Sequence, residues 1–366
     1  MRIKLRQAFD LQMGKTPARN RPDYWNGDHK WISIADIGNA GKFLTKTKES
    51  ITKAGIDGSG IKVVPQGTVI MSFKLSIGKT AITSEDMYTN EAIMAFIDNG
   101  KFAVDTDYLY HLCCGTNWTA GTNKAVMGLT LNKATLLEKK IPLPDINEQR
   151  EIATKLDKID AIIAERQQQL ELIDQAVKSR FIELFGDYDL THPQESWVTI
   201  KEIGTVVGGA TPKTDHDEYW GGSYRWITPA ELDADSGYIY DSVRKLTKAG
   251  VESCSLQEMP VGTVILSSRA PIGKVAIAGN TFYCNQGFKN IICKEGITPR
   301  YLYTVLLLNV EYLNSLGRGA TFKEISKGIV ESIRIPVPLM DLQQQFAAFV
   351  EQTDKSKLCG RMEVAA

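Results

Sequence analysis

The chain is built from an internal repeat. Short motifs in residues 14–90 return further along, and the members of each pair stand 195 positions apart. The pairs are GKTP at 14–17 with GATP at 209–212, YWNG at 24–27 with YWGG at 219–222, Trp31-Ile32 with Trp226-Ile227, Asp36 with Glu231, TKAG at 52–55 with 247–250, PQGTVI at 65–70 with PVGTVI at 260–265, and Ile77-Gly78-Lys79 with Ile272-Gly273-Lys274. A constant separation held over this length indicates a duplicated structural unit. The chain therefore folds as two copies of one domain.

Each copy ends in the same way. IPLP at 141–144 matches IPVP at 335–338, and Gln149 matches Gln343, now 194 positions apart. A helical pattern follows each of these prolines. The repeating unit is therefore one domain followed by one helix.

The first of these helices is long. Its apolar residues are spaced three and four apart, at Ile152, Leu156, Ile159, Ile163, Leu170, Ile173, Val177 and Leu184. This spacing is typical of a coiled-coil seam. It predicts a helix over 148–185, capped by Asn147 and ended by Gly186, that would be about 57 Å long at 1.5 Å per residue. One such rod cannot bury its own seam, so it needs a partner helix.

The second helix departs from the first. It places Phe346 and Val350 where the first copy has Ile152 and Leu156, but its pattern ends after Lys357. We expect it to be short, less than half the length of the first. The seam from Leu170 to Leu184 would then lack a partner within the chain and be covered by another subunit or by a second copy.

Composition narrows the function classes. The formal net charge is zero, which argues against a histone-like basic binder but allows local basic faces. The six cysteines form no C-x-x-C pair and there are only four histidines, so we expect no zinc site and a reducing, cytoplasmic setting. The N-terminal residues do not resemble a signal peptide, and no apolar run approaches a membrane span.

Catalytic motifs are not apparent. Gly78-Lys79-Thr80 resembles the end of a P-loop, but Phe73 stands where that motif needs glycine. The sequence shows no dinucleotide fingerprint, no methyltransferase motif, no nucleophile elbow and no H-E-x-x-H. We therefore predict no catalytic residues and no metal site.

Two duplicated polar loops are the strongest candidates for binding. Residues 71–79 and 266–274 each place two cations and hydroxyl groups around a glycine, and such a loop can bring lysine to phosphate and arginine to a guanine edge. The alternative is a surface turn whose glycine serves only the backbone. The candidate DNA-binding residues, with a second set nearer each domain's end, are Lys74, Ser76, Lys79, Asn117, Thr122, Lys124, Ser268, Arg269, Lys274, Arg318, Thr321 and Lys323. The repeated tryptophans could stack on bases, but we expect them in the core.

The predicted fold class is α+β. The strands 69–73 and 264–267 are β-branched runs bounded by glycine and proline, and 300–316 reads as a buried helix. The predicted organisation is a mixed α/β domain at 1–145, a spacer helix at 146–186, a second domain at 187–340 and a short helix at 341–366, divergent after 357.

Together, the tandem domains, the Tyr-Trp and Trp-Ile motifs, the Pro-x-Gly-Thr-Val-Ile strands and the Ile-Pro-x-Pro helix entries resemble the DNA-specificity subunit of type I restriction–modification systems. The resemblance covers the chain to about residue 357. It implies two target-recognition domains, each reading one half of a bipartite DNA site, with the helices packed antiparallel as a spacer. It also implies a non-catalytic subunit without a cofactor of its own, which joins two S-adenosylmethionine-dependent adenine methyltransferase subunits and ATP- and Mg-dependent motor-nuclease subunits.

A function from another class stays open. Tandem domains on a rod could form a scaffold that binds protein or glycan. Such a scaffold would be indifferent to DNA and to salt, whereas a DNA reader binds less tightly as salt rises.

Overall fold

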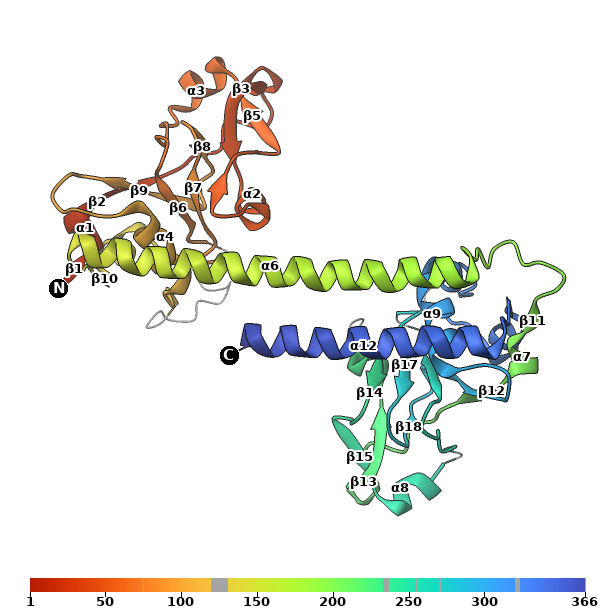
Figure 1. Ribbon diagram of the computed structural model, residues 1–366. Helices are drawn as coiled ribbons and strands as arrows, with labels where there is room; N and C mark the ends of the chain where they lie inside the picture. The colour runs from red at the N-terminus through yellow and green to blue at the C-terminus, as the bar shows by residue number, and fades with distance from the viewer. Residues whose placement is uncertain are drawn as a thin grey trace. The chain divides into compact units, whose positions relative to one another are not determined.

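The computed structural model describes residues 1–74, 76–119, 131–232, 237–254, 256–269, 271–319 and 323–365, with side chains to residue 357 in the last helix. The chain divides into two compact units, Met1–Ala164 and Glu165–Ala366. Helix α6 (Ile146–Phe185) begins in the first unit and ends in the second (Figure 1). Each unit is described by itself below.

Domain 1 contains three sheets. The five-stranded sheet has the order β2 (Phe9–Met13), β9 (Ile93–Asp98), β6 (Val69–Ser72), β7 (Thr80–Thr83), β4 (Phe43–Leu44). The three-stranded sheet has the order β5 (Glu49–Ile51), β3 (Trp25–Ile32), β8 (Tyr88–Thr89), and β1 (Arg2–Lys4) pairs with β10 (Lys140–Pro142). The helices are α1 (Leu5–Ala8), α2 (Ile34–Asn39), α3 (Lys53–Ser59), α4 (Thr106–Gly115) and α5 (Lys133–Glu138), with a 3₁₀ turn η1 (Pro22–Tyr24).

Domain 2 repeats this topology strand for strand. Its five-stranded sheet has the order β12 (Gly204–Gly208), β19 (Lys289–Cys293), β16 (Val264–Leu266), β17 (Val275–Ala278), β14 (Tyr238–Ile239). Its smaller sheets are β15 (Arg244–Leu246), β13 (Trp220–Ile227), β18 (Tyr283–Cys284), and β11 (Val198–Thr199) with β20 (Arg334–Ile335). The helical segments are α7 (Ile200–Ile203), η2 (Asp217–Tyr219), η3 (Pro229–Glu231), α8 (Lys248–Glu252), α9 (Pro299–Leu308), α10 (Val310–Ser315), α11 (Lys327–Ser332) and α12 (Met340–Ala365).

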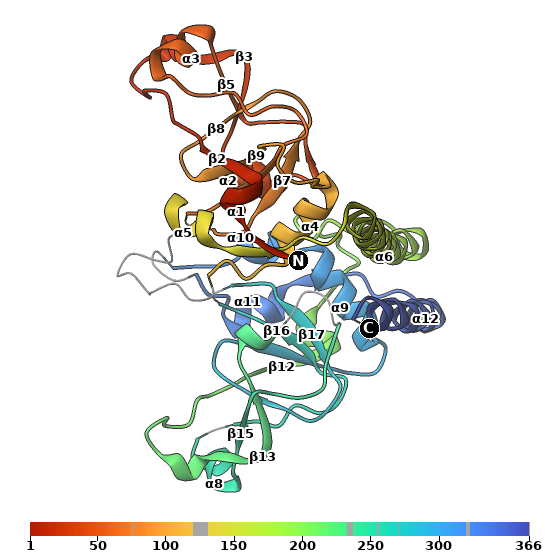
Figure 2. The ribbon, with the colours of Figure 1, turned by 90° about the vertical axis from the view of Figure 1, so that its left-hand side faces the viewer.

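In each domain the three-stranded sheet lies at the end away from the long helix that follows that domain (Figure 2). The five-stranded sheet of domain 1 is buried on both faces, and its central strand β6 shows this. Val69 and Met71 pack in one apolar cluster, whereas Ile70 packs in another. Side chains alternate across a strand, so a wholly apolar strand needs cover on both faces. The predicted strands 69–73 and 264–267 are confirmed to within one residue as β6 and β16.

The predicted helix at 300–316 is two helices. Asn309 interrupts it between α9 and α10, with φ −116° and ψ 31°. Its side-chain amide donates to the carbonyl of Val305 (2.9 Å), which ends α9. Asparagine competes for backbone partners in this way, and the apolar pattern around it conceals the break.

The long helix begins earlier than predicted. Asp145, not Asn147, is the cap, because its carboxylate accepts from the backbone N–H of Asn147 (3.0 Å) and of Glu148 (3.1 Å). The helix has 40 residues and ends, as expected, at Gly186, whose φ is +91°. The second helix, α12, is shorter, but its 26 residues exceed the predicted length of less than half of the first.

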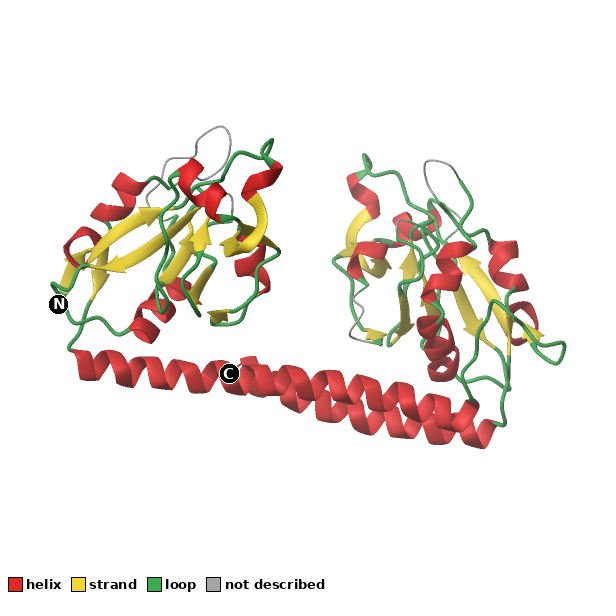
Figure 3. Cartoon of the chain, turned by 90° about the horizontal axis from the view of Figure 1, so that it is seen from above, coloured by secondary structure: helices red, strands yellow, loops and turns green. Residues whose placement is uncertain are grey.

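The prediction that the distal seam lacks a partner is wrong. Within the second unit, α12 runs alongside the end of α6 (Figures 1 and 3). Phe346 of α12 packs against Phe181 (5.4 Å between ring centroids) and Phe185 (5.7 Å), and Lys357 pairs with Asp174. Because the two helices run antiparallel, the start of α12 lies against the end of α6. Even a short second helix therefore covers the distal part of the seam.

The same aromatic pair also packs on domain 2. Phe181 stacks on Tyr301 of α9 with 5.7 Å between ring centroids, and Phe185 meets the same ring edge-on at 5.0 Å. Domain 1 has the counterpart surface, where Tyr108, Ile152 and Leu156 line a groove of about 790 Å³. The hydroxyl groups of Tyr108 and Tyr301 donate to equivalent carbonyls, those of Pro142 and Pro336. The two copies therefore share the groove, and in domain 2 the end of α6 fills it.

Phe181→Ala tests how much this packing contributes. The side chain is only 1% exposed, so we expect the free energy of unfolding of the second unit to fall by about 3–5 kcal/mol. The matched control is Ile162→Ala on the same helix, where the side chain is 56% exposed and the change should stay below about 1 kcal/mol. Urea unfolding of the full chain measures both. Equal effects would show that the aromatic cluster does not hold α6 to domain 2.

Candidate nucleic-acid interface

The two polar loops have the same backbone design. In domain 1 the Ser72 side chain accepts from the N–H of Lys79 (3.1 Å) and donates to the carbonyl of Ser76. In domain 2 the Ser267 side chain accepts from the N–H of Lys274 (2.8 Å) and donates to the carbonyl of Pro271 (2.7 Å). A glycine with positive φ stands in each loop, at +95° for Gly78 and +92° for Gly273. The serine and the glycine therefore shape the turn, and contact of the loop with DNA stays a prediction.

Lys79 and Lys274 point toward the turn that follows the long strand of the three-stranded sheet. The Lys274 ammonium donates to the carbonyl of Pro229 (3.1 Å), the first residue of η3, and to that of Leu232 (2.9 Å), which directly follows η3. The Lys79 ammonium lies against Gly38 of α2, where an added Cβ would be 2.5 Å from its Nζ. Lys274 thus stabilises its own domain through these two hydrogen bonds. Its contact with DNA stays a prediction that this conformation does not favour.

Arg269 lies in a small network that includes Glu324 and Lys289, which the sequence did not single out. Its backbone forms an isolated bridge with Glu324, and so does that of Arg318. The Glu324 carboxylate pairs with Lys289 (3.1 Å), whose ammonium also reaches the hydroxyl of Ser268 (3.3 Å). Ser268 is fully buried, so it serves packing rather than an exposed face. Ser268 and Arg269 of one candidate set therefore lie beside Arg318 of the other, joined through Lys289 and Glu324.

The other candidates are spread over two loops of each domain. Lys74 is half-buried with its ammonium 5.2 Å from the Phe73 ring centroid, and Ser76 is exposed. Asn117 is exposed after α4, and its side chain accepts from the N–H of Thr119 (3.1 Å). Arg318 and Lys323 are exposed. Thr122, Lys124 and Thr321 lie outside the described residues.

The repeated tryptophans belong to the core, as predicted. Trp31 and Trp226 are 2% exposed, and their indole N–H groups donate to the carbonyls of Lys15 (3.0 Å) and Ala210 (3.1 Å). Each ring meets a second tryptophan nearly at right angles, with 5.1 Å between ring centroids in both copies. An arginine covers the outer ring, Arg19 over Trp25 at 3.9 Å and Arg244 over Trp220 at 3.5 Å. These contacts occupy the faces on which bases would have stacked.

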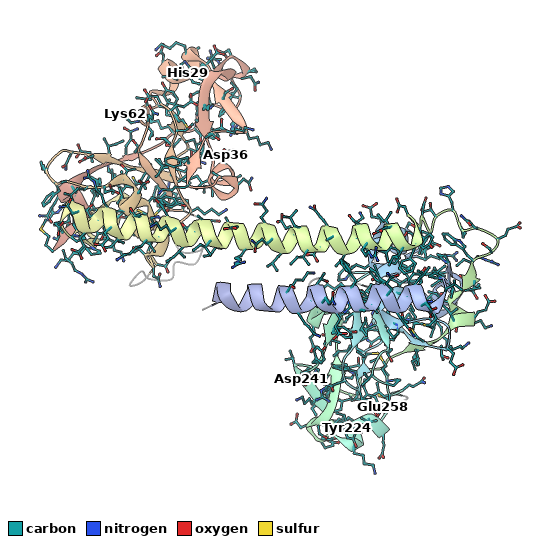
Figure 4. The ribbon with its side chains drawn as sticks, in the orientation of Figure 1. His29, Asp36, Lys62, Tyr224, Asp241 and Glu258 are labelled. Carbon is teal, nitrogen blue, oxygen red and sulfur yellow. The ribbon has the colours of Figure 1, made fainter. Side chains whose placement is uncertain are left out.

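In each domain one carboxylate connects the segment that directly follows the long strand, β3 or β13, to the next loop along the chain. Asp36 accepts from the N–H of Ser33 (2.7 Å) and from the N–H of Lys48 (2.9 Å). Glu231 accepts from the N–H of Thr228 (2.9 Å) and from the N–H of Val243 (2.7 Å). The carboxylate therefore pins the loops at 45–48 and 240–243 (Figure 4 labels Asp36, and Asp241 in the second loop). The equal spacing of Asp36 and Glu231 was the only sequence signal for this arrangement.

Ion pairs attach each domain to the helix that follows it. In domain 1, Lys42 pairs with Asp157 of α6 (2.5 Å) and with Asp107 (2.8 Å), while His111 reaches Asp157 (2.8 Å). In domain 2, Arg300 pairs with Asp354 of α12 (3.0 Å). Partial burial favours the neutral form of Asp157, but the hydrogen bonds from Lys42 and His111 outweigh it and lower the pKa of this carboxyl.

Asp157→Asn should therefore change stability in a pH-dependent way. The carboxyl has a lower pKa in the folded chain, so its ion pairs stabilise the domain above the unfolded-state pKa and lose this effect as the pH falls through the folded-state value. We expect the variant to be less stable at pH 7 by about 1 kcal/mol or less, since the pair is partly exposed, and the difference to fade below about pH 4. Thermal unfolding at several pH values measures it. Asp57→Asn, in the exposed pair with Lys53, is the control, and a difference that does not change with pH would contradict this role.

The described residues contain no group of three or more side chains suited to a metal ion. None of the described helices is both long enough and apolar enough to cross a membrane.

Comparison with known proteins decides the family. Residues 1–173 and 195–359 match the family model described as the type I restriction modification DNA specificity domain. The chain belongs to this family. The resemblance predicted from the repeated motifs is confirmed.

The relatives are specificity subunits of type I restriction enzymes. The MjaIX specificity subunit of Methanocaldococcus jannaschii is 42% identical over 184 residues, which are 49% of this chain and 42% of the relative. The EcoR124I/EcoR124II specificity subunit of Escherichia coli is 27% identical over 238 residues, 59% of this chain and 56% of the relative. The chain spans about half the length of the curated relatives it matches.

Two solved structures share the fold. The S subunit of a type I restriction–modification system from M. genitalium gives a TM-score of 0.57 at 14% identity, covering 100% of this chain and 92% of the other. A chain from a structural study of type I R-M complex assembly and conformational transition gives 0.60 at 18% identity, covering 100% and 93%. The α+β class with two repeated domains and long helices is therefore confirmed.

Proposed function

We propose that this chain is the non-catalytic DNA-recognition subunit of a type I restriction–modification complex, and that each domain reads one half of an asymmetric bipartite site. The observation that carries the proposal is the duplication itself. Two domains share the same strand order, the same tryptophan pair and the same pinned loop, yet they differ in exposed side chains. Equal scaffolds with unequal surfaces suit two unlike half-sites.

The long helix supports the second part of the proposal. A continuous α6 of 40 residues joins the two domains in sequence, and at 1.5 Å per residue it is about 60 Å long. Proteins that read separated half-sites set the spacing between them by their own geometry. We propose that α6 and α12 form this spacer and carry the docking surface for two methyltransferase subunits and the motor-nuclease subunits. S-adenosylmethionine, ATP and Mg would belong to those partners.

Exchange of one domain tests the proposal. Residues 1–145 are replaced by the equivalent domain of a relative with a different target, and the methylated motif is read by methylation-sensitive genome sequencing of a strain that makes the whole complex. We expect one half of the motif to change while the other half and the spacer stay the same. A motif altered on both sides would show that the domains do not read independently. A scaffold for protein or glycan would leave no sequence motif at all.

Arg269→Ala tests the polar loop of domain 2. Arginine can make a bidentate contact with guanine, and its loss should weaken binding by about 1–3 kcal/mol, only at targets with the intact second half-site. The control is Lys248→Ala on α8, a cation whose side chain is exposed and pairs with Glu252. Binding is measured by fluorescence anisotropy with duplexes altered in one half-site at a time. Equal affinities for the two variants would leave Arg269 with a structural role alone.

A further inference from the structure

The loops at 45–48 and 240–243 are held by similar hydrogen bonds but carry different exposed side chains. Besides the carboxylate that accepts from residue 48 or 243, the hydroxyl of Thr47 donates to the carbonyl of Glu49 (2.8 Å), and the hydroxyl of Ser242 donates to that of Arg244 (2.7 Å). The equivalent carbonyls of Thr45 and Tyr240 also accept a side-chain hydrogen bond, but from donors at positions that do not correspond: Lys30 donates to Thr45 (2.7 Å) and Asn280 donates to Tyr240 (2.6 Å). Two hydrogen bonds at equivalent positions, and a third to an equivalent carbonyl from a different donor, therefore fix the backbone of both loops.

The outward-facing residues of these loops differ in charge and in polarity. The exposed positions are Thr45, Lys46 and Lys48 in domain 1, and Tyr240, Asp241 and Val243 in domain 2. Thr47 and Ser242, which hold the frame, are half-buried and keep their hydroxyl. The two loops thus keep the side chains that fix the backbone and differ in the side chains that face solvent. Such a segment can present different side chains in one geometry.

Domain 2 also exposes apolar side chains at this loop, where their contact with water is unfavourable. Val243 is 87% exposed and Tyr240 is 61% exposed, although their backbone is held by hydrogen bonds to Glu231 and Asn280. A rigid backbone that presents an apolar side chain to solvent loses little conformational entropy when that side chain is covered by a partner. This favours a binding role over a simple connecting loop.

We propose that the loops at 45–48 and 240–243 are the base-reading tips of the two domains, and that Lys48 and Val243 set the difference between the half-sites. This rests on the proposed function. In the major groove, lysine pairs with the O6 and N7 acceptors of guanine, whereas an aliphatic side chain contacts the methyl group of thymine. The tip of domain 1 therefore selects a G·C pair and the tip of domain 2 an A·T pair. Asp36 and Glu231 are positioning residues, since they hold the tip without facing outward from it.

Substitutions of two exposed valines in domain 2 distinguish a residue that contacts a base from one that is only exposed. Val243→Ala removes the methyl groups at the tip, and Val261→Ala removes the same groups from an exposed valine of another turn, 66% exposed. We expect Val243→Ala to weaken binding of the whole complex to its own target duplex on the order of ten-fold, as for one lost base contact, and Val261→Ala to leave binding unchanged. Because neither valine is buried, the fold should survive both changes, as thermal unfolding can verify.

A loop exchange tests specificity directly. Residues 240–243 are replaced by Thr-Lys-Thr-Lys, which retains the hydroxyl at position 242, and the methylated motif is sequenced in a strain that makes the whole complex. The expected result is a changed base in the second half-site, from A·T toward G·C, with the first half-site unchanged. An unchanged motif, together with equal binding by Val243→Ala and Val261→Ala, would overturn the inference while the domain exchange above still stands. If the unaltered complex itself shows no bipartite motif, the proposed function fails and this inference fails with it.

Discussion

A buried glutamine joins each domain to the helix that follows it, and the rest of the arrangement depends on this contact. Gln149 donates to the carbonyls of Ala103 and Pro144 and accepts from the N–H of Asp105, while Gln343 makes the matching bonds to Gly296, Pro338 and Thr298. Both side chains are fully buried. An apolar residue there would leave three backbone groups unpaired, and each costs about 1–3 kcal/mol when buried. The start of each helix is therefore fixed to its own domain.

The two copies differ at the exposed positions of the loops that we propose to read DNA. Hydrogen bonds from the same backbone and side-chain positions hold the loops at 45–48 and 240–243, but the exposed residues change from cationic to apolar and acidic. The copies also differ at the base of the domain. The end of α6 fills the groove beside Tyr301, and the counterpart groove beside Tyr108 has a volume of about 790 Å³. Our proposal thus assigns stability and recognition to different parts of the same domain.

Much of the fold could be predicted from the sequence because the repeat supplies its own alignment. The strands β6 and β16 follow from apolar runs at a fixed separation, and the long helix follows from its seam. The repeat alone did not give the partner of the distal seam, because the packing of Phe346 on Phe181 joins positions that the repeat does not align, although the family resemblance implied antiparallel helices. Lys274 looks like an available cation in the sequence, yet its ammonium donates to two carbonyls more than 40 residues away. The loops at 45–48 and 240–243 could not be predicted for the opposite reason, because repeated motifs mark only the positions at which the two copies agree.

The most direct measurement is a hydroxyl-radical footprint of the whole complex on a duplex that carries its target. If each domain reads its own half-site, protection should fall on two separate segments, and substitutions confined to the tip at 240–243 should weaken protection of only one of them. A single continuous protected segment that loses protection uniformly would contradict the account, because the two domains would then act as one surface.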